Sequence, residues 1–375
     1  MKPFILISCL FCATQYMQAQ FTAVPDTNFE AYLEANGMGD GIPDNGLVLT
    51  ANIDTVTNLN LPNFAGITDL TGIEDFAALE FLNCSFNPIV QLDLSQNSSL
   101  SILGCAFTSL TSLDLSQNTS LMMLYCPSND QLTSLLLNSE HLTILECFEN
   151  QLTSLDLTNS PSLEYLDCES NNLTHLDISQ NASLSFLRIS DNPLTGLDTS
   201  QNALLTSLIS GYTNITELDL SQNINLTNVL VPFNPQLSFL DIRNGNNSSI
   251  GSFSAIQTDL DCIFVDDASA PYLEDWFKDP DTHFVNNEEK CDALSTLSFD
   301  REPFILYPNP TKDSVIVLAR LSALYTLVDM QGKSILTGTL RSSLNHIDVS
   351  QLPKGVYILT IQTEKKTSLK KIIKE

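Results

Sequence analysis

The fold is decided by the stretch from Leu79 to Ser99, which reads Leu-Glu-Phe-Leu-Asn-Cys-Ser-Phe-Asn-Pro-Ile-Val-Gln-Leu-Asp-Leu-Ser-Gln-Asn-Ser-Ser. The pattern L-x-x-L-x-C-x-x-N-x-L-x-x-L-D-L-S-x-N-x-x then repeats every 21 residues, as two similar halves of ten and eleven residues. One of its leucines recurs at residues 82, 103, 124, 145, 166, 187 and 208, and Val229 continues the series. Roughly eight such units span residues 79–243.

A single unit is too small to fold alone. About five inward apolar side chains contribute ~1.5–3 kcal/mol each when fully buried, whereas ordering the backbone costs ~1–2 kcal/mol per residue. Stacked units share one apolar core and overcome this cost together. Because side chains alternate along a strand, Leu82 and Cys84 point inward while Phe81 and Asn83 point outward. The period therefore predicts a repeat solenoid of parallel β-strands with turn connections.

Asparagines follow the strands at the positions where the chain must bend. Their amides can bond backbone groups that the bend leaves unpaired. In the first half of the unit these residues are Asn87, Asn150, Asn171, Asn192 and Asn234, and in the second half they are Asn97, Asn118, Asn181, Asn202 and Asn223. Thr108 and Thr213 stand where asparagine is expected, so the sequence leaves these two turns open.

The repeats resemble the leucine-rich repeat family, whose core is L-x-x-L-x-L-x-x-N/C-x-L. The nested LxxLxCxxN and LxxLDLSxN halves are similar to the 21-residue class found in many bacterial surface proteins. The resemblance covers about 165 residues. It implies a leucine-rich repeat solenoid, flanked by an N-terminal cap over residues 20–78 and a C-terminal cap over residues 244–292, because the ends of a solenoid otherwise expose apolar core. A short helix is expected over residues 29–36.

The last part of the chain has a different composition. Residues 303–375 hold ten of the sixteen Lys and Arg residues and five acids, a net charge of +5, whereas residues 1–302 carry 6 − 39 = −33. Such a change marks a domain boundary, and residues 293–303 are the expected linker. Short strand-like stretches at 314–319, 324–330, 334–340, 346–349 and 355–363, separated by turn signals, predict a small all-β sandwich over residues 304–375.

This segment is similar to the C-terminal sorting domain of type IX secretion cargo in Bacteroidetes. The resemblance implies contact with the type IX secretion machinery and a secreted or outer-surface location, and it leaves open whether the domain is cleaved. Four motifs are shared in order: Tyr307-Pro308-Asn309-Pro310, Asp329-Met-Gln-Gly332-Lys333, Leu352-Pro-Lys-Gly355-Val-Tyr357 and Lys370-Lys-Ile-Ile-Lys374.

Residues 1–19 have the order of a secretory signal peptide: a charged start, an apolar run from Pro3 to Ala13 and a small-residue end. The apolar run is too short to span a bilayer, and no later segment reaches ~18 uninterrupted apolar residues. We therefore expect no transmembrane segment in the mature chain.

Charge and motif content exclude several functions. The formal charge of −28 argues against nucleic acid as a partner, because phosphate binding needs a basic face. Four histidines make a histidine metal site or a histidine-dependent hydrolase improbable, and no GxSxG, HExxH, GxGxxG or P-loop motif occurs. The sequence predicts a protein that is not an enzyme and has no cofactor or metal site.

The cysteines form two groups. One recurs at the same inward slot of successive units, at Cys84, Cys105, Cys126, Cys147 and Cys168. Strands stack ~4.8 Å apart with parallel side chains, which suits buried free thiols better than disulfides or a zinc tetrahedron. Cys262 and Cys291 lie outside this row in an exported cap, so we predict a disulfide between them, with two unpaired thiols as the alternative.

Two rows of outward residues are candidate binding surfaces. An apolar row comprises Phe81, Ile102, Met123, Ile144, Tyr165 and Phe186. An acidic row comprises Asp93, Asp114, Asp156, Asp177, Asp198, Asp219 and Asp241, and Leu136 interrupts it. The apolar row would bind a ligand if it faces solvent. The acidic row would either bind cations or a basic partner, or consist of solvated carboxylates that bond the following Ser or Thr turn. The sequence thus predicts binding of an extracellular protein or glycan, with a self-associating envelope component as the alternative.

Overall fold

The computed structural model of the protein describes residues 20–295, 304–319, 322–341, 344–363 and 367–375. The predicted signal peptide at residues 1–19 and the expected linker from residue 296 onward lie outside the described residues. The chain divides into two compact units, residues 1–152 and 153–375. We call these the first and the second unit, and one 21-residue repeat a coil.

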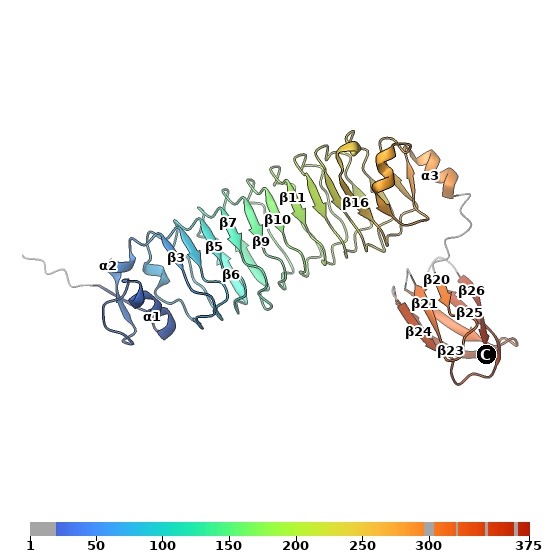
Figure 1. Cartoon of the computed structure of the whole chain (residues 1–375), viewed down its shortest axis with the longest axis horizontal. Coiled ribbons are helices and arrows are strands. Elements are labelled where there is room, and N and C mark those ends of the chain that lie inside the picture. The colour runs from blue at the N-terminus through green and yellow to red at the C-terminus, as the bar shows by residue number, and fades with distance from the viewer. Residues whose placement is uncertain (1–19, 296–303, 320–321, 342–343, 364–366) are drawn as a thin grey trace, which may run out of the picture. The chain divides into compact units, whose positions relative to one another are not determined.

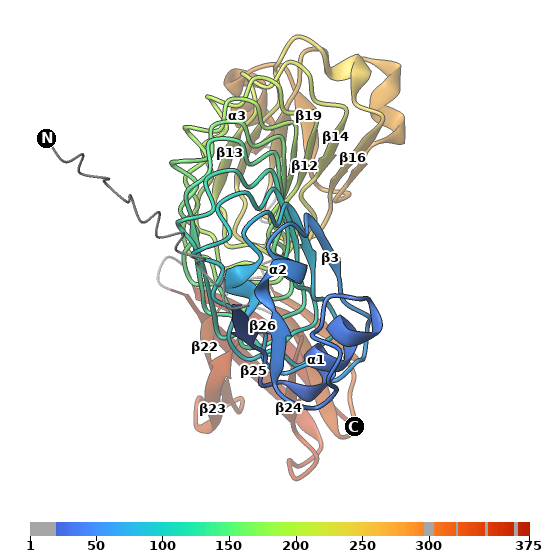
Figure 2. The ribbon, with the colours of Figure 1, turned by 90° about the vertical axis from the view of Figure 1, so that its left-hand side faces the viewer.

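The first unit begins with two short strands and two helices: β1 (Phe21–Ala23), α1 (Thr27–Ala35), β2 (Leu47–Leu49) and α2 (Thr50–Ile53). Helix α1 starts where the carboxylate of Asp26 accepts the N–H groups of Asn28 and Phe29, both at 3.0 Å. Phe29 and Leu33 of α1 are fully buried, and the Phe29 ring packs on Phe76. Figures 1 and 2 show α1 and α2 beside β3, where they cover the first coil.

The body of this unit is a ladder of parallel strands: β3 (Asn58–Asn60), β4 (Phe81–Asn83), β5 (Ile102–Gly104), β7 (Met123–Tyr125) and β9 (Ile144–Glu146). Leu103 pairs in register with Leu82 on one side and with Leu124 on the other, and all three are fully buried. The predicted superposition of the 21-residue leucines is therefore confirmed. The other elements are η1 (Ile73–Asp75) and the paired strands β6 (Ser112–Leu115) and β8 (Ser134–Leu137).

The second unit repeats this arrangement. Its larger parallel ladder contains β10 (Tyr165–Asp167), β11 (Phe186–Arg188), β12 (Ser207–Ile209), β14 (Asn228–Leu230), β16 (Ser252–Ala255) and β18 (Phe277–Lys278). Its smaller ladder contains β13 (Glu217–Asp219), β15 (Phe239–Asp241), β17 (Cys262–Phe264) and β19 (His283–Val285). Three short helices accompany them: η2 (Asn247–Ser249), η3 (Pro271–Asp275) and α3 (Glu288–Ser295). Parallel pairing thus continues into the segment that the sequence assigns to the C-terminal cap.

Side-chain amides join successive coils at both bends. Asn150 Nδ2 donates to the carbonyl oxygens of Cys126 and Cys147, at 3.0 and 2.8 Å. In the other half, Asn118 Nδ2 donates to Leu94 and Asn97 in the same way, at 2.9 and 3.0 Å. Each amide is buried, and each replaces backbone bonds that the bend cannot make.

The threonine at two of these bends does not disrupt the ladder. Thr108 donates its N–H and its hydroxyl to Oδ1 of Asn129 in the next coil, at 2.7 and 2.6 Å. Thr213 makes the equivalent pair of bonds to Asn234. The turn is therefore kept because the neighbouring coil supplies the amide.

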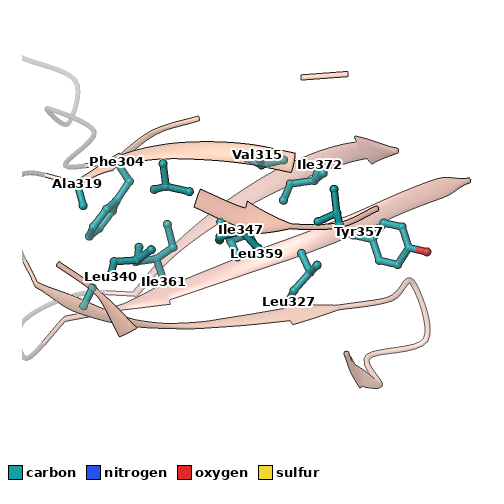
Figure 3. Packing of buried hydrophobic residues seen from close by; sticks show 13 residues of the cluster. Phe304, Val315, Ala319, Leu327, Leu340, Ile347, Tyr357, Leu359, Ile361 and Ile372 are labelled. Atoms are coloured by element: carbon teal, nitrogen blue, oxygen red, sulfur yellow. The ribbon is translucent and has the colours of Figure 1, made fainter. Parts of the chain in front are cut away.

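Residues 304–375 form two antiparallel sheets. One holds β20 (Phe304–Tyr307), β21 (Ser314–Ala319) and β24 (Leu344–Asp348), and the other holds β23 (Ser334–Leu340), β22 (Ala323–Val328), β25 (Gly355–Gln362) and β26 (Thr367–Lys374). Val315, Leu327, Leu359 and Ile372 are fully buried among the side chains that pack together in this domain (Figure 3). The predicted all-β fold is confirmed, with two strands, β20 and β26, that the sequence did not indicate.

Candidate binding surface

The apolar row lies on the outward side of the larger ladders, one side chain per coil. Phe81 pairs with Ile102, and Ile102 pairs with Met123, each between adjacent parallel strands. In the second unit, Tyr165 pairs with Phe186. All six predicted members of the row, Phe81, Ile102, Met123, Ile144, Tyr165 and Phe186, are half-buried. They bury their flanks against neighbouring coils and leave the outer part of each side chain in solvent.

The most ordered part of this row is the aromatic pair in the second unit. The Tyr165 and Phe186 rings stack with centroids 4.3 Å apart and an interplanar angle of 4°. At the same slot, the next two coils carry Ser207 and Asn228, which bond to each other at 2.8 Å. The row therefore changes from apolar to polar after Phe186.

An ion pair that sequence reasoning missed lies on the same strands. Arg188 bonds Glu169 Oε2 through Nη2 at 2.6 Å, and its Nη1 lies 3.7 Å from Oδ2 of Asp167. Asp167 is 3% exposed, and this burial raises the pKa of its carboxyl. A signal was present in the sequence, because Arg188 is the only Lys or Arg between residues 20 and 242.

The acidic row faces solvent but is engaged in its own turns. In six coils the Asp Oδ1 accepts the N–H of the residue two positions later, at 2.9–3.0 Å: Asp93, Asp114, Asp156, Asp177, Asp198 and Asp219. Bonds from that backbone N–H and its neighbouring hydroxyl lower the pKa of Asp93, Asp156 and Asp198. These carboxylates therefore close turns, as the more conservative of the two sequence interpretations expects.

Asp241 occupies the predicted slot opposite Asp219, but the prediction that it is exposed there is wrong. Asp241 is 6% exposed, and Arg243 covers it with a bond from Nε to Oδ1 of 2.9 Å. The Arg243 guanidinium also lies 4.9 Å from the centre of the Phe264 ring and donates to the Asn286 carbonyl. Arg243 lies just after β15, whereas Phe264 lies on β17 and Asn286 follows β19, and together these groups cover the slot, so the exposed row ends at Asp219.

Two acidic members line a shallow hollow in the second unit. Asp198 and Asp219 surround a volume of about 340 Å³ together with Glu217 and Phe239. Among the residues that the structure describes, no group of three or more His, Cys, Asp or Glu side chains is placed to hold a metal ion.

A second row was not predicted, and it follows the strands. The residue just before each turn asparagine or threonine has a left-handed backbone with φ of 52–59°: Phe86, Phe107, Ser128, Glu149, Ser170, Asp191, Tyr212 and Phe233. Phe64 has the same conformation one coil earlier, at φ 59°. Such a backbone is unusual for bulky residues. Position within the repeat could have identified this row, but residue type could not.

The aromatic members of this row gather in two places. In the first unit, Phe64 is 81% and Phe107 51% exposed, and both rings lie against Phe86, at 5.3 and 4.7 Å between centroids. We call these three residues the phenylalanine ridge. In the second unit, Tyr212 and Phe233 stack at 4.5 Å and 7°. Large exposed aromatic side chains are therefore fixed on the surface next to the strands.

The inward cysteines are buried thiols outside any disulfide, as the sequence predicts. Burial raises the pKa of Cys84 and Cys126 to about 12 and that of Cys105 well above its ordinary value. These thiols therefore stay protonated and act as small apolar side chains.

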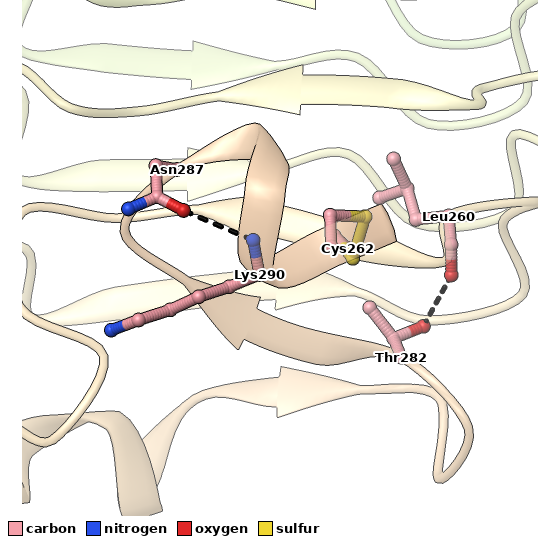
Figure 4. Close-up of a disulfide and its surroundings, with 6 residues drawn as sticks. Leu260, Cys262, Thr282, Asn287 and Lys290 are labelled. Carbon is pink, nitrogen blue, oxygen red and sulfur yellow. Dashed lines mark hydrogen bonds between the residues drawn. A yellow bond between two sulfur atoms is a disulfide. The ribbon is translucent and has the colours of Figure 1, made fainter. Parts of the chain in front are cut away.

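Cys262 and Cys291, the pair for which the sequence predicts a disulfide, are bonded to each other (Figure 4). The bond joins strand β17 to helix α3, with Cα atoms 6.0 Å apart. Nearby, Thr282 Oγ1 donates to the Leu260 carbonyl at 2.8 Å, and Asn287 accepts the N–H of Lys290 at 3.0 Å (Figure 4). The disulfide thus holds α3 over the last coil.

The predicted sorting motifs have structural roles in the C-terminal domain. Asn309, between Pro308 and Pro310, donates Nδ2 to the Lys371 carbonyl at 2.7 Å and accepts the Ile373 N–H at 2.8 Å. It therefore acts as a partner for the last strand, β26. Tyr307, the first residue of this motif, is the last residue of β20.

The remaining motif residues shape turns. Gly332 has a φ of 83° in the turn after β22, where Asp329 Oδ1 accepts the N–H groups of Gln331 and Lys333. Gly355 begins β25, and the Tyr357 hydroxyl donates to the Pro353 carbonyl at 2.8 Å. Each motif thus fixes the entry or exit of a strand.

Within the described ranges, no helix combines the length and the apolar character needed to cross a membrane.

Comparison with known proteins adds one family. Residues 305–375 match the family described as secretion system C-terminal sorting domain. No curated protein matches the chain. The chain is similar to the solved functional domain of InlJ from Listeria monocytogenes, which includes a cysteine ladder, at 20% identity and a TM-score of 0.45, over 96% of this chain and 100% of that one. It is also similar to internalin C2 from Listeria monocytogenes, at 18% identity and a TM-score of 0.39, over 66% and 98% of the two chains.

The organisation of the chain follows from the register of its coils and from this family match. Leucines 21 residues apart pair strand to strand, and buried asparagine amides such as that of Asn150 join successive coils at the bends. The C-terminal domain marks the protein for secretion or for the outer cell surface. The chain is therefore a parallel-strand β-solenoid with a 21-residue period, followed by a domain, residues 305–375, that matches the secretion system C-terminal sorting domain family.

Proposed function

We propose that the protein is a secreted or cell-surface binding protein that recognises an extracellular protein or glycan through the outward side of its larger strand ladders. The observation that carries this proposal is the half-buried apolar row, above all the stacked pair Tyr165 and Phe186. Contiguous apolar side chains on a surface mark contact sites. Tyr and Arg dominate binding energy at interfaces, and Arg188 lies on the same strand as Phe186.

The site suits binding better than catalysis. The ladder offers a broad platform of fixed side chains rather than an enclosed pocket that would desolvate a reaction. Its carboxylates are already engaged, since Asp167 and Glu169 pair with Arg188 and the acidic row closes turns. We therefore infer that the protein is not an enzyme. We also infer that residues 304–375 contact the type IX secretion machinery.

The direct test screens the full chain on an array of extracellular proteins and glycans. A ligand found there should bind the variant Tyr165→Ser/Phe186→Ser at least about tenfold more weakly, because hot-spot aromatics dominate such contacts. Serine fits this slot, since Ser207 occupies it in the next coil. The matched control is Leu204→Ser, which removes an exposed apolar side chain at 53% exposure from another slot. Retained binding by the double serine variant would reject the site.

The alternative is a self-associating envelope component. It predicts concentration-dependent oligomers in sedimentation, whereas the binding proposal predicts monomers. Charge opposes self-association through the first unit, because residues 20–152 contain sixteen Asp and Glu and no Lys or Arg.

A further inference from the structure

We propose that the phenylalanine ridge, Phe64, Phe86 and Phe107, is a docking site for a cationic protein surface that presents Lys or Arg side chains. This inference rests on the proposed function, that of a binding protein, and names a second contact region and the chemistry of its partner.

The turn itself does not require phenylalanine at this slot. Within the same unit, Ser128 and Glu149 adopt the same left-handed conformation, at φ 56° and 54°. Ser128 donates its hydroxyl to Glu149 Oε2 at 2.7 Å, so polar side chains are well accommodated there. Phenylalanine on three successive coils, each in a disfavoured backbone region, is therefore not explained by the turn and points to a role for the exposed rings.

The three rings are contiguous, and their backbone is bonded from coil to coil. Backbone bonds run from the Phe64 N–H to the Phe86 carbonyl at 2.9 Å and from the Phe86 N–H to the Ala106 carbonyl at 2.8 Å. The Phe107 N–H continues this series to Pro127 at 3.1 Å. The backbone that carries the three rings is thus fixed on the ladder of coils, which sets where the rings emerge. Phe64, at 81% exposure, is the most accessible of the three.

The acidic charge of the first unit favours a cationic partner at the phenylalanine ridge. Residues 20–152 contain sixteen acids and no Lys or Arg, so the surface around the ridge attracts cations and repels a second copy of itself. Lys and Arg bind aromatic rings through cation–π contacts, and their apolar stems pack on such rings while the charged heads reach out. Two coils beyond Phe107, the same row carries the carboxylate of Glu149, roughly 10 Å away at the usual strand spacing.

The test measures binding of the full chain to immobilised ten-residue peptides in which Leu alternates with Arg, with Glu or with Gln. We expect the Arg–Leu peptide to bind and the other two to bind at least about tenfold more weakly. Binding to Arg–Leu should weaken as salt rises. The variant Phe64→Ser/Phe107→Ser should lose at least about tenfold in affinity for Arg–Leu.

Controls keep the result interpretable. Serine already occupies this slot at Ser128 and Ser170, so the double variant should melt no lower than the wild type. Tyr212→Ser changes the equivalent slot of the other unit and should leave peptide binding unchanged. Equal binding of Glu–Leu, or unchanged Arg–Leu binding by the phenylalanine variant, would overturn the proposal.

Two further outcomes would also overturn it. A glycan ligand or concentration-dependent dimerisation that only Phe64→Ser/Phe107→Ser abolishes would assign the ridge to a different occupant. If an array ligand depends on Tyr165 and Phe186 but no cationic peptide depends on the ridge, the proposed function survives and this inference fails.

Discussion

The side-chain amide of Asn309 is bonded to the main chain of Lys371, 62 residues further along, with Nδ2 donating to the carbonyl oxygen across 2.7 Å. The same amide accepts the Ile373 N–H, and the next bonds of this edge run from Thr311 to Ile373 and from Glu375 to Thr311, both at 2.9 Å. The first motif of the sorting domain therefore covers the edge of its last strand.

Replacing Asn309 by Ala should loosen that strand. Two hydrogen bonds are lost, so we expect the local opening free energy of residues 371–375 to fall by about 1–3 kcal/mol. Amide exchange of Ile373, measured by NMR or mass spectrometry, should accelerate accordingly. Asn309→Asp is the companion variant, because it keeps the acceptor for Ile373 but sets a carboxylate oxygen against the Lys371 carbonyl in place of the donor. Unchanged exchange in Asn309→Ala would show that the amide does not hold the strand.

Removing the disulfide should destabilise the end of the second solenoid unit. The bond closes a separation of 29 residues, for which the loop-entropy model gives roughly 3–4 kcal/mol. The variant Cys262→Ala/Cys291→Ala should show lower protection of α3 in amide exchange and a lower melting temperature. Wild-type protein treated with dithiothreitol should behave in the same way, since the remaining described cysteines are thiols outside any disulfide. An unchanged melting temperature in both would contradict this.

The variant Arg188→Ala should be destabilised in a pH-dependent manner. It leaves the buried Asp167 without its cation, at a cost of about 1–3 kcal/mol at neutral pH. Burial already holds the folded pKa of Asp167 above its ordinary value of 3.8. A carboxyl whose pKa is raised in the folded state binds its proton more tightly there than in the unfolded state. The stability lost through the unpaired Asp167 carboxylate therefore grows as the pH rises above the ordinary pKa of 3.8 and shrinks as the pH falls toward it.

Urea unfolding at pH 4.5 and 7.5 measures this difference. The double variant Asp167→Asn/Arg188→Ala is the control, because it removes the unpaired charge and should recover part of the stability at pH 7.5. Equal losses for Arg188→Ala at both pH values would reject a role for the Asp167 charge.

Calcium should not shift the melting temperature beyond the effect of matched ionic strength. The reason is that one oxygen of each carboxylate, Oδ1, already accepts a backbone N–H, as Asp177 does from Ser179 and Asp198 from Ser200, both at 2.9 Å, and that no group of three acidic side chains in the described residues is placed to hold a metal ion. Differential scanning fluorimetry with calcium and with matched sodium chloride tests this. A calcium-specific shift that Asp177→Asn/Asp198→Asn/Asp219→Asn abolishes would instead establish the row as a cation-binding strip.

The sequence predicted the parallel register well because one physical cause dominates it. A leucine every 21 residues can be buried only if the coils superpose, and Leu103 and Leu124 do pair. The outward slot of Phe81 followed from strand alternation alone. These features depend on residues close in sequence and on their repetition.

Other features depend on contacts that no repeat pattern contains. Asp241 is buried because Arg243 and the added strands cover it, although its coil reads like the others. Strand β26 was missed because it lacks a clear alternation of apolar and polar residues. Lys370 and Lys371 are adjacent in it, and its one fully buried side chain is Ile372. The left-handed row was missed because Phe, Ser and Glu all occupy that backbone conformation here, so residue type did not signal it.

The amide bonds between coils have a consequence for evolution. Asn118 bonds to the coil before it through Leu94 and Asn97, and Asn202 does so through Ile178 and Asn181 with the same geometry. Since each added copy presents the same junction, tandem duplication of a 21-residue gene segment would lengthen the solenoid without redesigning its interior. The length of the solenoid and the area of its binding surface could then vary between lineages through the number of repeats, while the surface side chains diversify independently.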